Sequence, residues 1–466
     1  MPYNLVVICL DTFRWDLLNH RGPVRVALPH LDALRADSVE FVEAFGEGQP
    51  TIPVRRAYFT GQRSFPWRFD YDTEGLWPTG RGWHKIPPEQ QTLAEILLNH
   101  GYQTGLVSDT YHMFKPTMNF TRGFLAYEFI RGYESDNYRS GRLPVGALQS
   151  FVRDPEPHKH PILTQYLLNI RDRQREEQWL TARVFRRAMQ WVRDHREAQP
   201  FMLWVDSFAP HEPWDPPRSY VDSIDGLYEG IEFIYPAGLQ TNDLSSAEAQ
   251  RVQHLYLGYL AFVDTWVGKL LTSLQTAGVW DRTIVVLLSD HGTELLDHGR
   301  FGKYPSHLFR HNTQIVWTIR HPQHPGRQEV ASLVQSHDVF PTLLSCLNIE
   351  YQTVDGRNVW IEGNQGREQD RPWIVSGWDN YASVRDKEWN YIVNFEDPEA
   401  DERLYELISD PGEQRDVAAM HPETVRIMRE HLEGFLGQKL PAWLPDTVRP
   451  GIAPVSRYYQ ALNLRD

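Results

Sequence analysis

Short apolar runs alternate along this chain with segments whose apolar positions recur every three to four residues. Five of the runs have the length and composition of buried strands, at residues 5–10, 103–107, 201–205, 283–288 and 315–319. Four other segments show helical periodicity, at residues 92–100, 164–194, 246–276 and 338–347. This alternation predicts the α/β fold class, as a sandwich of helices around a large, mainly parallel sheet.

The pattern changes in the last hundred or so residues of the chain. Short alternating segments at 373–376, 383–385 and 391–395 are typical of antiparallel strands, and a helical pattern follows at 423–435. We therefore predict an α/β domain over residues 1–365 and a smaller C-terminal α+β subdomain, with an antiparallel sheet, over residues 366–466.

Composition and charge narrow the classes of protein. The chain has 466 residues, of which 41% are hydrophobic and 23% charged, so a sizeable core is expected. Its 47 Lys and Arg against 61 Asp and Glu give a net charge of −14, which disfavours binding to a nucleic-acid polymer. No stretch reaches the ~18 apolar residues of a membrane span, and the run at 5–10 is too short for a signal peptide. We expect a cytoplasmic protein that binds neither nucleic acid nor membrane.

Two of the predicted strands end in polar residues that can bind a metal. The first strand leads into Asp11, and the strand at 283–288 leads through Ser289 into Asp290 and His291. A lone carboxylate after a strand can equally cap the next helix. An adjacent carboxylate and imidazole are natural ligands of a divalent cation, so the pair Asp290 and His291 favours a metal site.

A Gly/Pro-rich loop over residues 46–50 leads into Thr51, Pro53 and a short helical stretch that stops at Gly61. Thr51 can be interpreted as the N-cap of that helix. It can also be interpreted as a nucleophile at a helix N-terminus, where the helix dipole favours an incoming anion. Arg55, one turn later, would then bind substrate oxygens. Local spacing leaves both interpretations open.

Taken together, these motifs resemble those of the sulfatase family within the alkaline phosphatase superfamily. The resemblance covers nearly the whole chain, and its motifs occur in the family's order, at residues 4–11, 51–55, 101–105, 208–214, 289–303, 338–342 and 404–413. It implies an alkaline-phosphatase-like sandwich and a divalent metal (Mn, Zn or Ca) at one site. The resemblance also implies a role for eight residues. They are Asp11, Asp290 and His291 as metal ligands, Thr51 as nucleophile and metal contact, Arg55, His211 and Lys303 as catalytic and substrate-binding residues, and, more loosely, His298 as a substrate-binding residue.

The chain departs from the sulfatase pattern at the nucleophile. Sulfatases have Cys or Ser at the position of Thr51 and oxidise it to the aldehyde formylglycine. Threonine is a secondary alcohol and cannot form that aldehyde, so no formylglycine is expected. An ester on Thr51 would have to be hydrolysed at phosphorus or sulfur, which is ordinary chemistry for a phosphoenzyme. Threonine is similar to the nucleophile of the superfamily's nucleotide phosphodiesterases, which favours phosphate.

Three other positions differ from the sulfatase pattern. Thr12 stands where sulfatases have a second acidic residue, and His291 stands where they have asparagine. Asp290-His291 resembles the phosphonate monoester hydrolases and phosphodiesterases of the superfamily. Asp109 lies nearest to the position of a sulfatase lysine. Exchanging a cation for a carboxylate suits a monoanionic diester, or a second metal that restores the charge.

The sequence leaves several roles open. Aromatic residues of the long segments 61–89 and 131–161 could line a pocket or cover the sheet edge; they are Trp67, Trp77, Trp83, Tyr133 and Tyr138. Residues near the predicted strand ends could form a second metal site; they are Asp109, His112, Asp206, His211, His307 and His311. Other residues are predicted to be solvated, namely 171–177 on a helix face and His158, His160, His321 and His324 in loops. Cys9 and Cys346, both in apolar runs, are predicted to be core residues.

We conclude from the sequence that the chain is a metal-dependent hydrolase of a small anionic ester. A phosphodiester or a phosphonate monoester is the expected substrate. The alternatives are a sulfuric ester hydrolase of arylsulfatase type and a non-catalytic relative that only binds an anion. Whether the chain forms a homo-oligomer stays open.

Overall fold

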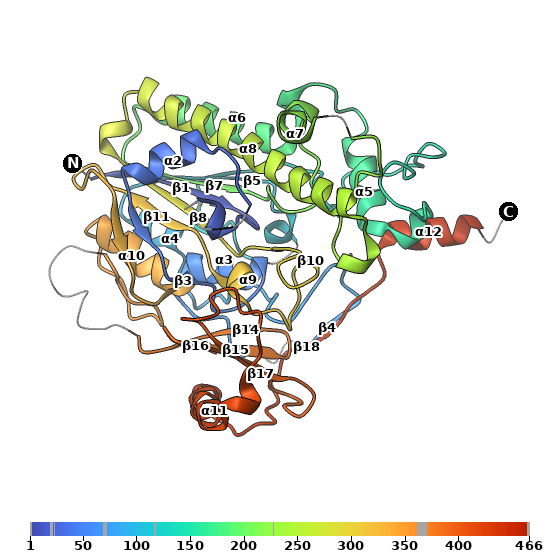
Figure 1. The fold of residues 1–466 in the computed structure, drawn as a ribbon. Helices are drawn as coiled ribbons and strands as arrows, with labels where there is room; N and C mark the ends of the chain where they lie inside the picture. Colours follow the sequence, from blue (N-terminus) through green and yellow to red (C-terminus); the bar gives the residue numbers. More distant parts are fainter. Residues whose placement is uncertain are drawn as a thin grey trace.

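A computed structural model describes residues 2–463 except 19–21, 23, 69–71, 116–117, 227 and 361–370. Its main feature is an eight-stranded sheet (Figure 1). The strand order is β12 (Gln328–Val330), β2 (Val39–Phe41), β11 (Trp317–Arg320), β8 (Thr283–Ser289), β1 (Asn4–Leu10), β7 (Phe201–Ser207), β5 (Gln103–Ser108) and β6 (Ala126–Phe129). Neighbouring strands run parallel except that β11 is antiparallel to β8 and β2. The predicted mainly parallel sheet is confirmed.

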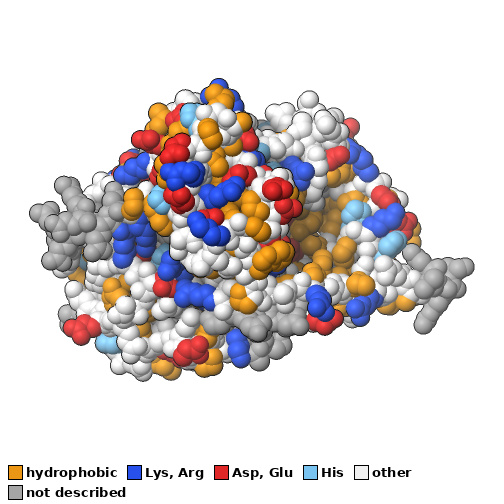
Figure 2. Space-filling view, turned by 90° about the horizontal axis from the view of Figure 1, so that it is seen from below, with side chains coloured by type: hydrophobic (Ala, Val, Ile, Leu, Met, Phe, Trp, Pro, Cys, Tyr) orange, Lys and Arg blue, Asp and Glu red, His pale blue; other side chains and the backbone are white. Residues whose placement is uncertain are grey.

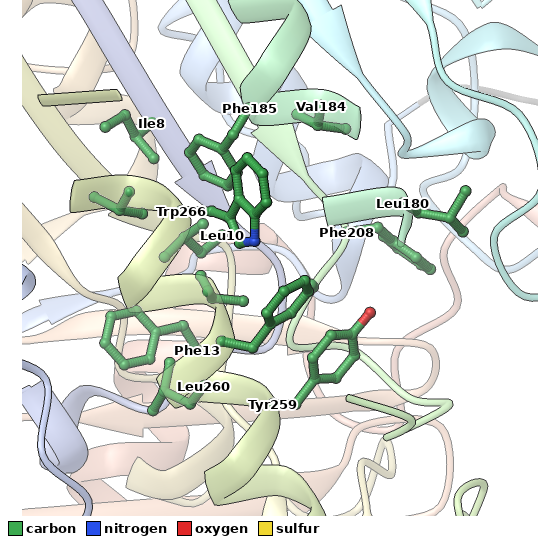
Figure 3. Packing of buried hydrophobic residues seen from close by; sticks show 14 of the residues in the cluster. Ile8, Leu10, Phe13, Leu180, Val184, Phe185, Phe208, Tyr259, Leu260 and Trp266 are labelled. Carbon is green, nitrogen blue, oxygen red and sulfur yellow. The ribbon is translucent and has the colours of Figure 1, made fainter. Parts of the chain in front are cut away.

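Helices cover both faces of this sheet, as the alternation of patterns predicts. On β1, Val6, Ile8 and Leu10 pack into the cluster that contains α6 (Leu180–His195) and α8 (Ser246–Thr276). Figure 3 shows Ile8 and Leu10 beside Phe185 and Trp266 of these helices. The alternate β1 residues pack on the opposite face, whose helices are α3 (Thr51–Thr60), α4 (Leu93–Asn99) and α10 (Val339–Cys346) (Figure 1).

The predicted continuous helix over 164–194 is wrong. The segment forms α5 (Pro161–Ile170), a single 3₁₀ turn at Glu176–Gln178 and then α6. Residues 171–178 contain no apolar side chain that could be buried in a helical stripe, so tertiary packing does not extend the helix through them. Arg173 instead pairs with Asp215 and lies 3.9 Å above the ring of Trp179. The charged segment 171–177 is therefore a connection and not the face of a long helix.

A second, antiparallel sheet follows in the C-terminal part, as predicted. Its strands, in spatial order, are β14 (Ile374–Trp378), β15 (Tyr381–Arg385), β16 (Trp389–Asn394) and β17 (Glu402–Glu406). Helix α11 (Pro422–Leu436) packs on this sheet and lies on its far side from the main sheet (Figure 1). The predicted boundary at 365/366 falls in the segment 361–370, outside the described residues.

Smaller elements complete the fold. The pairs of short strands are β3 (Ala44–Phe45) with β13 (Val334–Gln335), β9 (Glu294–Leu295) with β10 (Phe301–Gly302), and β4 (Asp72–Glu74) with β18 (Thr447–Arg449). The remaining α-helices of the described ranges are α1 (Trp15–Leu18), α2 (Pro29–Ala36), α7 (Arg218–Asp225), α9 (Arg310–Thr313) and α12 (Pro454–Asn463). Cys9 and Cys346 are free and buried, as predicted. None of the helices in the described ranges combines the length and the apolar character needed to cross a membrane.

Candidate active site

Three adjacent strands in the middle of the main sheet deliver acidic residues to one edge. Leu10, the last residue of β1, lies opposite Ser289 of β8 and Ser207 of β7. Because parallel strands end at the same edge, Asp11 and Asp290 emerge side by side, with Asp206 on the neighbouring strand β7. Asp11, Asp206 and Asp290 are all completely buried. A site at this edge was predicted from the strand ends.

Asp11, Asp290 and His291 form a cluster in which one donor atom of each lies within 4.8 Å of the others. The His291 Nδ1 lies 2.8 Å from the carbonyl oxygen of Gly292, so Nδ1 carries the proton and Nε2 has the lone pair. Within the described part of the chain, this buried Nε2 has no hydrogen-bond partner. It lies 3.5 Å from the Asp290 Oδ2 and 3.8 Å from the Asp11 Oδ1. A neutral imidazole beside two carboxylates fits a divalent cation.

The two carboxylates of this cluster compete in the absence of a cation. Burial and the neighbouring Asp290 raise the pKa of Asp11, against the opposing effect of Arg55. Burial also lowers the pKa of His291 against the opposing effect of Asp290, and the positive charges of Lys303 and Arg55 lower it further. The free site therefore favours a proton on the Asp11–Asp290 pair and a neutral His291, and a bound divalent cation would replace that proton.

Thr12 binds both carboxylates in place of a further acidic residue. Its backbone N–H donates to the Asp290 Oδ1 at 3.0 Å, and its Oγ1 donates to the Asp11 Oδ1 at 2.7 Å. Its φ of +62° is unusual for a β-branched residue and stores strain of about 1–3 kcal/mol. The strained backbone thus orients the two carboxylates toward His291.

Thr51 is the first residue of α3, and the N-cap position is occupied by Pro50. The capping interpretation of Thr51 is therefore wrong. Arg55 Nη1 donates to the Thr51 carbonyl at 3.2 Å and to the Asp290 Oδ2 at 2.6 Å, and it lies 3.0 Å from the Asp11 Oδ2. Arg55 therefore ties the start of α3 to the metal-ligand cluster.

The C-terminal sheet holds the loop that precedes Thr51. The N–H of Gln49 donates to the carbonyl of Gly377, and the N–H of Gly377 donates to the carbonyl of Glu47, at 2.8 and 2.9 Å. The Ser376 hydroxyl donates to the carbonyl of Gly46 at 2.5 Å. Strand β14 therefore fixes the entry of the chain into α3.

Lys303 and His211 form a second part of the site. Lys303 Nζ lies 3.1 Å from the His211 Nε2 and 2.9 Å from a carboxylate oxygen of Glu212. The His211 Nδ1 lies 2.5 Å from the Glu212 carbonyl, so Nδ1 donates there and Nε2 accepts from Lys303. Burial lowers the pKa of His211 to about 3, and Lys303 lowers it further against the effect of Glu212. His211 is therefore neutral in the free protein, and the mobile proton lies on Lys303.

In the contacts of the described residues, His298 lies apart from Lys303 and His211, among Glu294, Gly412 and Phe309. Its Nδ1 lies 3.1 Å from both carboxylate oxygens of Glu294, and its Nε2 lies 3.1 Å from the carbonyl of Gly412. Its ring stacks on Phe309 at 3.8 Å. His298 thus joins the β9–β10 hairpin to the C-terminal part, and the described contacts do not bring it to Lys303 or to the metal-ligand cluster.

The six residues considered for a second metal site do not converge. Asp206 pairs with Arg55 at 2.9 Å, and Asp109 accepts from the N–H of Phe208 at 2.6 Å. Each histidine of the set has its own neighbour: His112 with Glu134, His211 with Lys303, His307 with Glu294 and His311 with Asp297. Among the described residues, one group brings three potential metal ligands together, and it is Asp11, Asp290 and His291.

Two buried carboxylates have roles that sequence reasoning missed. Asp206, considered only as a metal ligand, is the main partner of Arg55, and its position at the end of a strand was the available signal. Glu134 lies in the long segment 131–161, where no motif marks it. Its Oε2 accepts from the Tyr111 hydroxyl at 2.7 Å and lies 3.8 Å from the His112 Nε2. Burial raises the pKa of Glu134 to about 7.

The aromatic residues of the long loops divide into two groups. Trp67 and Tyr133 are completely buried, and the Tyr133 hydroxyl donates to the His211 carbonyl at 2.8 Å. Trp77 and Trp83 line a cavity, and Tyr138 lines a different one. The prediction that His321 is solvated is wrong, because it packs against Tyr3 and Trp360 and is buried.

Comparison with known proteins decides the family. The sulfatase family profile matches residues 3–349, about three quarters of the chain. This chain belongs to the sulfatase family. It is a sulfatase-family ester hydrolase with the fold of the alkaline phosphatase superfamily, as the motifs indicated.

Several relatives and solved structures each match more than nine tenths of this chain. Arylsulfatase K of Bos taurus is 22% identical over 93% of this chain and 81% of the relative. N-acetylgalactosamine-6-O-sulfatase of Bacteroides thetaiotaomicron is 22% identical over 92% of each chain. Phosphonate monoester hydrolase of Agrobacterium radiobacter superposes with a TM-score of 0.68 at 21% identity, covering 93% of this chain and 95% of the other. A structure solved with its substrate D-glucosamine-2-N,6-O-disulfate gives 0.70 at 16% identity, covering 94% and 98%.

Proposed function

We propose that this sulfatase-family chain is a metal-dependent hydrolase that uses Thr51 as nucleophile to cleave a phosphoester, either a phosphodiester or a phosphonate monoester. The observation that carries the proposal is the position of Thr51. Its hydroxyl is free of a capping role at the N-terminus of α3, and Arg55 ties this residue to Asp11 and Asp290.

The chemistry of threonine favours phosphorus over sulfur. Formylglycine hydrate can expel sulfate by eliminating from its second hydroxyl, and Thr51 has no second hydroxyl. An ester on Thr51 must therefore be opened by water at phosphorus or sulfur. In the first step Thr51 Oγ1 bonds to phosphorus, the bond to the leaving oxygen breaks, and the leaving alcohol takes a proton. In the second step water attacks the same phosphorus, and the Thr51 hydroxyl is restored.

Asp11, Asp290, His291 and Thr51 are the residues that would hold the divalent cation, which supplies Lewis-acid stabilisation of the reacting oxygens when it is bound. Arg55 contacts the carboxylates of Asp11 and Asp290 and also donates to the Thr51 carbonyl, so it connects the start of α3 to them. The helix N-terminus itself favours negative charge near Thr51.

Lys303 and His211 serve the leaving-group side. Lys303 carries the proton in the free protein, and its positive charge stabilises negative charge on the departing oxygen. His211 is neutral and fixes the direction of the Lys303 ammonium. A substrate anion beside His211 would raise its pKa and allow it to share in the proton transfer.

The balance of charges favours a monoanionic ester. Arg55 is already paired with Asp11, Asp206 and Asp290, and Lys303 with Glu212. Asp109, near the position of a sulfatase lysine, is buried and accepts a backbone hydrogen bond. Such a site offers little uncompensated positive charge for a dianion, which suits a diester or a phosphonate monoester.

The test is a panel of four aryl esters with one leaving group: a phosphodiester, a phosphate monoester, a phosphonate monoester and a sulfate. Metal-free protein is assayed before and after reconstitution with Mn²⁺ or Zn²⁺. We expect metal-dependent cleavage of the diester or the phosphonate, with kcat/KM at least about 1,000-fold lower in Thr51→Ala. Thr51→Ser, which keeps the hydroxyl, is the matched control and should retain most of the wild-type activity.

The second candidate is a sulfuric ester hydrolase, which the names of the arylsulfatase K relatives favour. Sulfate turnover as the leading activity would establish it and would overturn the argument from threonine chemistry. Tight anion binding without turnover of any of the four esters would instead indicate a non-catalytic relative.

A further inference from the structure

A cavity of about 540 Å³ is lined by residues from three segments of the chain, around Trp83, Tyr111 and Arg131. Its wall contains the aromatic residues Trp83, Tyr111, Phe114 and Phe129 and the cationic residues Lys115 and Arg131. Phe114 and Phe129 stack at 4.3 Å with their rings nearly parallel, which gives the wall a flat apolar surface. Figure 2 shows a hollow with hydrophobic walls on the face that is seen from below.

Short contacts connect this cavity to the leaving-group side of the site. The hydroxyl of Tyr111 donates to Glu134 at 2.7 Å, and the ring of Tyr111 lies 3.9 Å from that of His112. His112 lies 5.6 Å from Phe208, on which His211 stacks at 4.2 Å. The charges of Lys303 and Lys115 both act on the pKa of Glu134, after the larger effect of burial. A leaving group that departs on the His211 side of the site would therefore lie where these ring contacts begin, on the side of the cavity.

Lys115 is the unusual residue of the cavity. Its ammonium lies 5.4 Å from the centre of the Trp83 ring and 5.9 Å from that of Tyr111, and it donates to the carbonyl of Pro78. Within the described ranges, no carboxylate lies within salt-bridge distance of Lys115. Arg131, by contrast, is paired with Asp136 at 2.6 Å. Two of the three Lys115 N–H groups therefore have no acceptor in these contacts.

We infer that this cavity binds the leaving group of the substrate, and that the leaving group is a flat apolar moiety that carries a second negative charge, which Lys115 binds. The inference deepens the proposed function, on which it rests, by naming the class of leaving group. The stacked rings receive the flat face, and the unpaired ammonium receives the anion. Burial lowers the pKa of Lys115 to about 8, so the group is still mostly charged at pH 7.

The test compares two leaving groups, p-nitrophenol and p-nitrophenol with a carboxylate on the ring, each as the phosphodiester and as the sulfate. The quantity measured is the ratio of kcat/KM for the carboxylated ester to that for the plain ester. Comparing this ratio between variants removes the difference in leaving-group reactivity. We expect the ratio to fall at least about tenfold in Lys115→Met.

Two further variants serve as controls. Lys159 lines the neighbouring cavity, is half exposed and pairs with Asp154, so Lys159→Met should leave the ratio unchanged. Lys115→Arg keeps the positive charge and should retain most of the preference. An unchanged ratio in folded Lys115→Met would overturn the inference, as would a wild-type protein without any preference for the carboxylated ester.

A binding measurement separates this inference from the proposed function. Quenching of tryptophan fluorescence by the two free phenols reports the cavity without any turnover, because Trp77 and Trp83 line it. Preference for the carboxylated phenol that is lost in Lys115→Met, without hydrolysis of any ester, would support the cavity and contradict the hydrolase. Hydrolysis with equal binding of both phenols would support the hydrolase and contradict the cavity.

Discussion

At the scale of single residues, Arg55 organises the buried charges of the site. Its guanidinium contacts carboxylate oxygens of Asp11, Asp206 and Asp290 at 2.6 to 3.0 Å, and all four side chains are completely buried. A buried ion pair contributes little net stability, but removal of one partner leaves the other charges without compensation. Arg55 is therefore expected to matter for folding as well as for activity.

We predict that Arg55→Met lowers the free energy of unfolding of the metal-free protein by about 3–5 kcal/mol. The substitution keeps the length of the side chain and leaves buried carboxylates unpaired. Urea unfolding followed by circular dichroism measures the effect. Arg187→Met is the matched control, because Arg187 makes an exposed ion pair with Glu128, and it should cost less than about 1 kcal/mol. Equal losses in the two variants would contradict this account of Arg55.

The metal-ligand cluster could be predicted from sequence because strand ends mark it. Asp11 and Asp290 each follow a buried strand, and the structure brings them together with His291. Thr12 and Glu134 could not be assigned roles in the same way. Their contacts depend on a left-handed backbone, with φ of +62° and +44°, which no local signal such as glycine announces.

At the scale of elements, the β9–β10 hairpin depends on an ion pair between Glu294 and His298. Hydrogen bonds from His298 and His307 lower the pKa of Glu294 to about 2, although burial opposes the shift. Burial also opposes the charge on His298, yet Glu294 raises the pKa of His298 above its ordinary value. Glu294 and His298 are therefore both charged between pH 4.5 and pH 6.5, the ordinary pKa values of the two groups.

This pair predicts a pH window for stability. The contribution of Glu294 is present above its ordinary pKa of 4.5 and is lost as pH falls toward about 2. The contribution of His298 is present below its ordinary pKa of 6.5 and is lost as pH rises through its raised value. Thermal unfolding of metal-free protein should show a plateau between these limits. In Glu294→Gln that plateau should fall by on the order of 3 kcal/mol, and the acid slope should flatten.

Glu423→Gln is the control for this prediction, because Glu423 lies exposed in an ion pair with Arg426 on α11. Its pH profile should follow that of the wild-type protein. If Glu294→Gln also followed the wild-type profile, the ion pair would not be what stabilises the hairpin.

Strands and helices with strong apolar patterns were predicted well, because burial determines them. The parallel strands at 5–10, 103–107, 201–205 and 283–288 all occur, within one or two residues. The prediction failed at 171–178, where a periodic pattern on either side was extended across a segment without apolar positions. Helix continuity there depends on tertiary packing, which the pattern does not contain.

At the scale of the whole molecule, the C-terminal sheet supports the loop that precedes Thr51. Gly377 of β14 exchanges backbone hydrogen bonds with Glu47 and Gln49, just before Thr51. A Cβ atom at Gly377 would lie 2.3 Å from the ring of buried Phe65. The close approach of these two segments, more than 300 residues apart, is what the absence of a side chain allows.

We predict that Gly377→Ala lowers both stability and turnover. Steric overlap with Phe65 should cost about 1–3 kcal/mol of unfolding free energy, and the displaced loop should lower kcat at unchanged metal affinity. Gly434→Ala is the control, since no atom lies within 4 Å of its added Cβ on α11, and it should be neutral or stabilising by up to about 1 kcal/mol. A normal kcat in a destabilised Gly377→Ala would contradict the claim that the C-terminal sheet positions the loop before Thr51.

The order of the motifs was sufficient to predict the superfamily fold, and the sulfatase family match confirms it. The support of Gln49 by Gly377 was not predictable, because it depends on backbone contacts between distant segments and on no particular side chain. The sequence therefore predicts the candidate site residues, whereas the structure shows that β14 binds the loop before Thr51.

The stereochemical course at phosphorus tests the central claim most directly. An aryl diester made chiral with oxygen isotopes is hydrolysed by the metal-loaded protein, and the configuration of the product is determined by NMR. Attack by Thr51 followed by attack of water involves two in-line displacements, so the account predicts net retention of configuration. Net inversion would show a single displacement by water and would contradict the role of Thr51 as nucleophile.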